Sequence, residues 1–167
     1  MRGHRGTIRV YSEPGLGSTF KVLLPAGERP ADAPRSREAA ELQEWRGRGT
    51  VLLVDDDENI RRLGTEMLTE LGFQVVTAAD GREGVEIFRS RDDISVVLLD
   101  LTMPQLDGEQ CFLELRRIDP GVRVVMSSGF SEHEVTRKFL GKGIAGFVQK
   151  PYKLAALRKA LMDAGCR

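Results

Sequence analysis

The chain has 167 residues, of which 41% are hydrophobic and 30% charged, so it is long enough for one ordinary domain and a smaller segment. Its 25 basic and 25 acidic side chains give a formal net charge of zero, so no overall field attracts nucleic acid or an anionic membrane. No apolar run approaches the roughly 20 residues of a spanning helix, and no apolar signal region follows Met1. Because Cys111 and Cys166 have no disulfide-framework spacing, we expect a cytoplasmic chain without nucleic-acid or membrane contact.

Residues 7–25 predict a β-hairpin. Apolar residues alternate with polar ones on both sides of a Pro-Gly turn, and Pro25 ends the second strand. A lone two-stranded hairpin is marginal in water, so we expect it to be the edge of something larger. Residues 26–49 are rich in Pro, Ala, Gly and mixed charges, which indicates a linker in which 38–45 favour a helical turn or two.

From Thr50 onward, short apolar runs alternate with stretches of helical period. We predict that the runs are strands, at 51–54, 74–77, 95–99, 122–126 and 144–148. We predict helices at 59–71, at 81–88 after Asp80, and at 107–118, 132–140 and 154–162. Strands that alternate with helices predict an α/β fold with a doubly wound, five-stranded parallel sheet. The predicted domains are a hairpin at 1–25, a linker at 26–49 and an α/β domain at 50–167.

Two of the predicted helices show apolar faces that we expect to be buried. The face of the first helix, which Gly72 ends, consists of Ile60, Leu63, Met67 and Leu71. The face of the helix at 107–118 consists of Cys111, Phe112, Leu115 and Ile118.

Polar side chains gather where the predicted strands end. Right-handed crossovers place the carboxyl ends of all the strands on one edge of the sheet. The residues there are Asp55, Asp56 and Asp57 after the first strand, Asp100 after the third, Ser127 and Ser128 after the fourth, and Lys150 and Pro151 after the fifth. Taken singly, Asp57 suits a helix N-cap, Ser127 a loop serine and Lys150 a surface lysine.

Together these residues suit the chemistry of a phosphoryl group. Several converging carboxylates cannot all stay ionised without a cation, and oxygen ligands favour Mg²⁺. A lysine neutralises phosphoryl oxygens, and a hydroxyl donates a hydrogen bond to them. Asp100 would then be a carboxylate nucleophile that forms an acyl phosphate.

Residues 50 to about 165 resemble the receiver domain of two-component response regulators. Four segments carry the resemblance, in family order and with family-like gaps: VLLVDDDENI, LLDLTMPQLDG, VVMSSGF and GFVQKPY. The resemblance implies a flavodoxin-like fold, phosphorylation of Asp100 and binding of Mg²⁺. It also implies that Asp56 is a direct metal ligand, that Asp55 lies more in the outer shell, and that Asp100 and the backbone carbonyl of Thr102 complete the protein's ligands.

The same resemblance implies which residues respond to phosphorylation. Ser127 matches the switch hydroxyl, and Lys150 matches the active-site lysine. Pro151 matches the proline that often follows this lysine through a cis bond. Phe147 matches the aromatic switch position, here without the hydroxyl that tyrosine brings.

Residues 4–25, HRGTIRVYSEPGLGSTFKVLLP, resemble the last strands of a histidine kinase ATP-binding domain, with its final glycine box at 15–20. The sequence lacks the asparagine-bearing helix, the first glycine box and the phosphoacceptor-histidine helix of such kinases. We therefore expect no kinase activity, and we take Gly15 to Gly17 as a turn rather than a phosphate site. The resemblance implies that the chain is the tail of a hybrid sensor histidine kinase.

The expected function is signal relay in a phosphorelay. A histidine kinase or a histidine phosphotransfer protein would donate a phosphoryl group to Asp100, and output would pass to protein partners because no DNA-binding segment follows Arg167. One alternative is a receiver-like interaction module that is not phosphorylated, which the intact acids, hydroxyl and lysine argue against. A second alternative is an ATP-binding kinase fragment. The absence of the first glycine box and the asparagine-bearing helix from the sequence argues against it.

Overall fold

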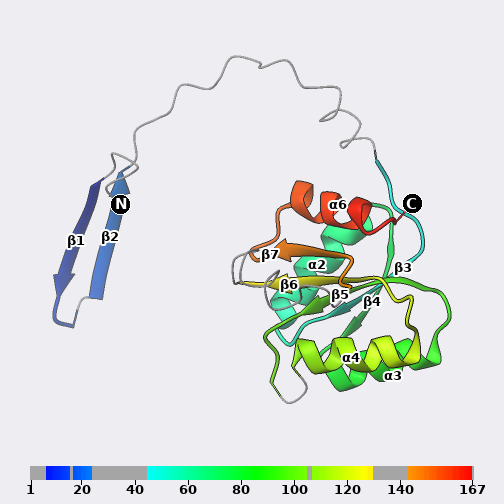
Figure 1. The fold of residues 1–167 in the computed structure, drawn as a ribbon. Helices are drawn as coiled ribbons and strands as arrows, with labels where there is room; N and C mark the ends of the chain where they lie inside the picture. The colour runs from blue at the N-terminus through cyan, green and yellow to red at the C-terminus, as the bar shows by residue number, and fades with distance from the viewer. Residues whose placement is uncertain (1–6, 16, 24–44, 105–106, 130–142, 167) are drawn as a thin grey trace. The chain divides into compact units, whose positions relative to one another are not determined.

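The structure is a computed structural model that describes residues 7–15, 17–23, 45–104, 107–129 and 143–166 (Figure 1). The chain divides into two compact units, Met1–Arg35 and Ser36–Arg167. Residues 38–44 of the helical turn expected at 38–45, and the helix expected at 132–140, lie outside the described residues. None of the helices in the described part of the chain has both the length and the apolar character needed to cross a membrane.

The first unit contains the predicted hairpin, formed by antiparallel strands β1 (Thr7–Glu13) and β2 (Gly17–Leu23). Gly15 and Gly17 both have positive φ angles, 81° and 88°, which the tight turn between the strands requires. Cross-strand pairing brings Ile8 beside Val22 and Val10 beside Phe20 on one face. These four side chains are between 44% and 67% exposed, so the hairpin has an apolar face that no described residue covers.

The second unit is the predicted doubly wound fold. Its five strands are β3 (Thr50–Val54), β4 (Gln74–Ala78), β5 (Ile94–Asp100), β6 (Val124–Ser128) and β7 (Gly146–Gln149). They form one parallel sheet in the order β4-β3-β5-β6-β7. The four described helices are α2 (Glu58–Glu70), α3 (Gly81–Ser90), α4 (Gly108–Ile118) and α6 (Leu154–Asp163). Helices α2 and α6 cover one face of the sheet, and α3 and α4 cover the other (Figure 1).

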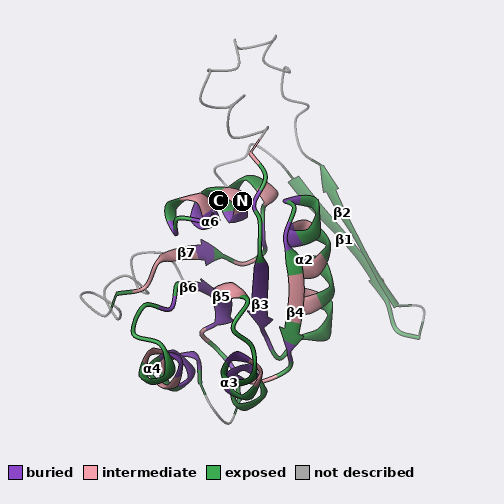
Figure 2. Cartoon of the chain, turned by 90° about the vertical axis from the view of Figure 1, so that its right-hand side faces the viewer, coloured by how far each residue is buried: buried purple, intermediate pink, exposed green. Residues whose placement is uncertain are grey.

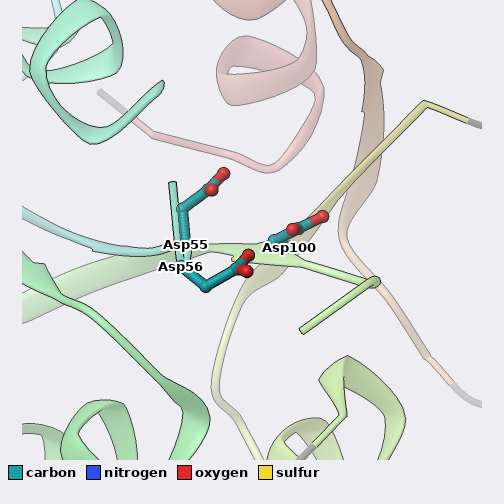
Figure 3. A group of neighbouring side chains, drawn as sticks. All are labelled: Asp55, Asp56 and Asp100. Carbon is teal, nitrogen blue, oxygen red and sulfur yellow. The ribbon is translucent and has the colours of Figure 1, made fainter. Parts of the chain in front are cut away.

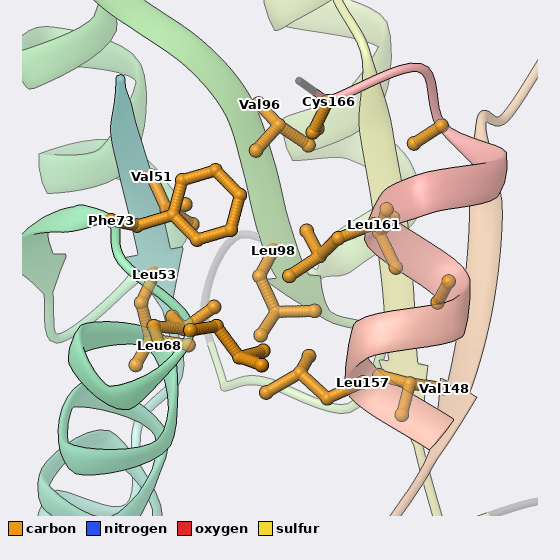
Figure 4. Packing of buried hydrophobic residues seen from close by; sticks show 14 of the residues in the cluster. Val51, Leu53, Leu68, Phe73, Val96, Leu98, Val148, Leu157, Leu161 and Cys166 are labelled. Atoms are coloured by element: carbon orange, nitrogen blue, oxygen red, sulfur yellow. The ribbon is translucent and has the colours of Figure 1, made fainter. Parts of the chain in front are cut away.

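Successive strand residues alternate between these two faces, because side chains of a strand point to opposite sides. Along the sheet, Leu53, Leu98, Val125 and Val148 pack with α2 and α6. Figure 4 shows Leu53, Leu98 and Val148 in this layer. Their neighbours Val54, Leu99, Met126 and Phe147 pack with α3 and α4. The central strands are buried on both faces (Figure 2), which explains why they appear in the sequence as unbroken apolar runs.

Three helices begin at aspartates that follow the strand ends or their loops. Asp57, Asp80 and Asp107 are the N-caps of α2, α3 and α4, and each carboxylate accepts hydrogen bonds from backbone N–H groups of the first turn. Hydrogen bonds from the N–H groups of Asn59 and Ile60 lower the pKa of Asp57. The N-cap interpretation of Asp57 is therefore confirmed.

The predicted bounds of strands that carry site residues were wrong. Asp100 does not follow the third strand but is the last residue of β5, which runs over Ile94–Asp100 instead of 95–99. Ser127 and Ser128 do not follow the fourth strand but are its last two residues, and β6 begins at Val124 instead of Val122. The N–H of Val122 donates to the carbonyl of Asp119, so this valine still belongs to the turn after α4. Strand β7 likewise runs over Gly146–Gln149 instead of 144–148, and Lys150 follows it directly.

The predicted buried faces of α2 and α4 also need correction. Leu63 and Ile118 are exposed, and the buried residues within α2 are Gly64 and Leu68. A Cβ at Gly64 would lie 2.8 Å from a methyl group of Leu53, so glycine lets the helix approach β3 closely. An apolar pattern cannot reveal a buried line that contains a glycine.

Residues 45–49, expected to belong to the linker, pack against the end of α2 and the residues that follow it. The rings of Trp45 and Phe73 lie 5.9 Å apart, and the N–H of Gly47 donates to the carbonyl of Leu71. A Cβ at Gly47 would lie 1.9 Å from the Phe73 ring, so this position has no room for a side chain.

Candidate functional site

Side chains alternate between the two faces of the sheet along each strand, and this places three polar side chains on the same face at the carboxyl edge. Asp100 and Ser127 each come two residues after a side chain that packs with α2 and α6, and Asp55 comes two residues after Leu53. All three therefore leave the sheet on the α2–α6 face. Parallel pairing sets Asp100 beside Ser127, and Val54 beside Leu99, so the carboxyl ends of β3, β5 and β6 are level. The structure brings these three predicted residues together.

Three carboxylates form a cluster at this edge (Figure 3). Oxygens of Asp55, Asp56 and Asp100 all lie within 4.8 Å of one another. Asp55 and Asp100 are buried, whereas Asp56 is exposed. The Nη1 of Arg61 donates to the backbone carbonyls of Asp55 and Asp56, at 2.7 and 3.0 Å, which fixes the loop that carries the acid pair.

Lys150 is the cation that meets the buried acids. Its Nζ lies 2.7 Å from Oδ2 of Asp55 and 3.0 Å from Oδ2 of Asp100. Burial lowers the pKa of Lys150, but the close contacts with the two carboxylates outweigh it, so the pKa is raised. Burial raises the pKa of Asp55, even though Lys150 opposes that shift. The Lys150–Pro151 peptide bond is cis.

The donor set of the cluster fits a hard divalent cation. Three carboxylates face one ammonium group, so negative charge exceeds positive charge among these four side chains. Oδ2 of Asp55 is buried and accepts no hydrogen bond of regular geometry from a described residue, although the Lys150 ammonium group is close to it. All the available ligand atoms are oxygens, which suits Mg²⁺. The N–H of Thr102 donates to Oδ1 of Asp100 at 3.2 Å, so the Thr102 backbone also lies at this site.

Ser127 has a partner that the sequence interpretation missed. Its Oγ lies 2.8 Å from the hydroxyl of Tyr152, and both residues are buried. The Tyr152 ring packs in the cluster between the sheet, α2 and α6. Burial raises the pKa of Tyr152 and the charges of Asp55 and Asp100 raise it further, while the Ser127 hydrogen bond lowers it. The aromatic residue that follows Lys150-Pro151 in GFVQKPY was the available signal.

Phe147 is not brought to Ser127. It is half-buried, pairs with Met126 in the sheet register and packs with the α3–α4 cluster. The side chains of Phe147 and Ser127 therefore leave the sheet on opposite faces.

Comparison with known proteins adds independent findings. Residues 51–162 match the family model described as "Response regulator receiver domain". The chemotaxis protein CheY of Halobacterium salinarum is 32% identical over 114 residues, which cover 68% of this chain and 93% of that protein. The solved CheX–CheY–BeF3–Mg complex from Borrelia burgdorferi is 32% identical with a TM-score of 0.66, over 71% of this chain and 90% of that one.

A longer relative matches nearly the whole chain. The sensor kinase CckA of Brucella abortus is 33% identical over 165 residues, or 95% of this chain. The same match spans 18% of that kinase, and a match to the transcriptional regulatory protein GlrR of Escherichia coli spans 26% of that protein. The chain is thus much shorter than these two relatives.

Proposed function

This chain belongs to the response regulator receiver domain family, and from that premise we propose that Asp100 accepts a phosphoryl group from a phosphohistidine of a partner protein. The observation that carries the proposal is the cluster of Asp55, Asp56 and Asp100 with Lys150 at the carboxyl edge of the sheet. An unphosphorylated docking module would have no need of buried acids with excess negative charge.

In the proposed step, a carboxylate oxygen of Asp100 attacks phosphorus as the P–N bond to the histidine breaks. The electron pair of that bond returns to the imidazole nitrogen, which takes up a proton, and an acyl phosphate remains on Asp100. Lys150, which already contacts Oδ2 of Asp100, neutralises charge on the phosphoryl oxygens. The Ser127 hydroxyl donates one hydrogen bond to them.

The metal in this proposal is Mg²⁺, held by Asp55, Asp56, Asp100 and the backbone carbonyl of Thr102. When bound, it supplies positive charge that offsets the oxygens of the incoming phosphoryl group. The excess of three carboxylates over one ammonium group supports a further cation here. The Mg and BeF3 named for the Borrelia complex, in a chain of the same fold, give further support.

The test is phosphorylation by a small phosphodonor with Mg²⁺, followed by mass spectrometry of the intact chain. We expect wild type to gain one phosphoryl group and Asp100→Asn to gain none. Asp93→Asn is a matched control, because Asp93 directly precedes the strand that Asp100 ends. Equal labelling of Asp100→Asn and wild type would contradict the proposal.

We further propose that residues 4–25 are the end of a histidine kinase ATP-binding domain, so that the chain is the tail of a hybrid sensor kinase with domains at 1–25, 26–49 and 50–167. The match to CckA supports this, because it extends over both units of the chain. The uncovered apolar face of the β1–β2 hairpin is also typical of a strand pair taken from a larger sheet.

The hairpin alone should neither bind ATP nor act as a kinase, because one glycine turn offers no adenine pocket and no metal-holding asparagine. Calorimetry should show no saturable heat when ATP is titrated into the chain. Saturable binding that disappears on deletion of residues 1–49 would overturn this expectation.

The proposed partners are a histidine kinase or a histidine phosphotransfer protein, with a response through Ser127 and Phe147. The expected cytoplasmic location stays a prediction, with which the free thiols of Cys111 and Cys166 are compatible.

A further inference from the structure

The hydroxyl of Tyr152 is a buried polar group that the proposed phosphoryl transfer does not use. It lies 2.8 Å from Oγ of Ser127, and either oxygen can be the donor. Tyr152 is 6% exposed and Ser127 is fully buried, so water does not compete freely for this hydrogen bond.

The Tyr152 ring is held firmly in place. It packs in the cluster that contains Leu53, Leu157 and Leu161. A Cβ at Gly64 would lie 3.5 Å from the ring edge, so α2 approaches it closely. Lys150, two residues earlier, is held by its ion pairs with Asp55 and Asp100. The tyrosine hydroxyl is thus a fixed point, whereas the serine hydroxyl moves by rotation about one bond.

We propose that Tyr152 is a positioning residue that holds the Ser127 hydroxyl away from Asp100 in the resting site and releases it when a phosphoryl group arrives. The inference rests on the proposed function, since it concerns the same site. The Ser127 oxygen occupies one staggered position at a time. Rotation of Oγ towards a phosphoryl group on Asp100 therefore breaks the Tyr152 contact, and that contact competes with phosphoryl binding.

The inference concerns Tyr152 and not Phe147, the aromatic residue that the family resemblance implies as a switch position. Phe147 has no hydroxyl and leaves the sheet on the opposite face from Ser127. Among the described residues, Tyr152 is the aromatic side chain that hydrogen-bonds the Ser127 hydroxyl.

The test uses beryllofluoride with saturating Mg²⁺ as a phosphoryl analogue, with binding to the full chain followed by NMR. Tyr152→Phe keeps the ring and removes the competing hydrogen bond. We expect it to tighten beryllofluoride binding by between about twofold and tenfold, the worth of one ordinary hydrogen bond. Tyr11→Phe is the matched control in the hairpin, and we expect it to leave the affinity unchanged.

A double-mutant cycle separates this role from a merely structural one. In a Ser127→Ala background the hydroxyl that Tyr152 holds is gone, so adding Tyr152→Phe should no longer change the affinity. The same shift in both backgrounds, or unchanged or weaker binding by Tyr152→Phe alone, would overturn the inference and leave the proposed function standing. Failure of the wild type to bind beryllofluoride would instead overturn the proposed function, and the inference with it.

A second measurement does not depend on how Tyr152→Phe folds. The chain has two tyrosines, so Tyr11→Phe leaves Tyr152 as the single tyrosine hydroxyl. We expect the resonance of this hydroxyl proton, or its exchange with water, to change when beryllofluoride and Mg²⁺ are added. A signal that stays the same in a chain that has bound the analogue would mean that the hydrogen bond survives, which contradicts release.

Discussion

Aspartates lie at both ends of β5, and their surroundings differ in one respect that matters for function. Asp93, just before the strand, accepts hydrogen bonds from Nε and Nη2 of Arg91 and from Oγ1 of Thr50, at 2.9, 2.8 and 2.8 Å. Its charge is fully matched, and the hydrogen bonds from Arg91 and Thr50 lower its pKa to about 2. At this end of β5, Asp93 and Arg91 form an ordinary stabilising ion pair.

The other end of the same strand has the opposite balance. Asp100 shares Lys150 with Asp55, and Asp56 adds a third carboxylate. Burial raises the pKa of Asp55, which means that keeping this carboxylate ionised in the folded chain costs free energy. The comparison teaches that matched charge at a strand end stabilises the fold, whereas a cluster in which carboxylates outnumber the cation favours a cationic ligand.

We expect the largest effect from a substitution that removes Lys150. Lys150→Met removes the one cation among the described residues that pairs with both Asp55 and Asp100, and we expect it to lower the free energy of unfolding by up to about 3 kcal/mol without Mg²⁺. Denaturant unfolding measures this, and added Mg²⁺ should restore part of the loss. Lys159→Met is the control, because its ion pair with Asp163 is exposed and should contribute little. Equal stabilities of Lys150→Met and wild type would break the comparison.

The next effect concerns the cation itself. Asp56→Asn removes one ligand and one negative charge, so we expect Mg²⁺ affinity to fall at least about tenfold. Because repulsion among the acids also falls, the same variant should melt at a higher temperature than wild type when Mg²⁺ is absent. Asp57→Asn is a close control, since it removes a neighbouring charge and asparagine is an equally good N-cap. An unchanged Mg²⁺ titration of Asp56→Asn would count against the ligand assignment.

The smallest effect is expected at the matched end. The pKa of Asp93 is lower in the folded chain than its ordinary value of 3.8, so its ion pair stabilises the fold above that pH and loses this contribution as the pH falls towards about 2. Asp93→Asn should therefore melt slightly below wild type at about pH 6, with a difference that shrinks as the pH is lowered towards 3. A melting difference that grew on acidification would show that the sign is wrong.

The sequence predicted the sheet well, because the strands that form its centre are buried on both faces and appear as apolar runs such as Val51–Val54 and Val96–Leu99. It also predicted that acids, a serine and a lysine meet at one edge, since parallel topology alone requires that. It placed Ser127 just after the fourth strand because a polar residue after an apolar run looks like a strand end, and pairing with Asp100 extends the strand instead.

Other features depend on tertiary packing that the sequence does not display. Asp55 and Asp56 are adjacent and identical, yet the fold buries the first and exposes the second in the loop after β3. The hydrogen bond between Tyr152 and Ser127 joins residues 25 positions apart, and it depends on how the chain turns after Pro151. Local pattern contains no signal for such a contact, although the aromatic residue itself is visible.

The most direct test of the account is chemical mapping of the acyl phosphate. After treatment with a small phosphodonor and Mg²⁺, borohydride reduces an acyl phosphate of aspartate to homoserine, which peptide mass spectrometry locates. The account predicts homoserine at position 100, with Asp55, Asp56 and Asp93 recovered unchanged. Homoserine at one of those three positions, with Asp100 intact in a chain that has taken up phosphate, would contradict it.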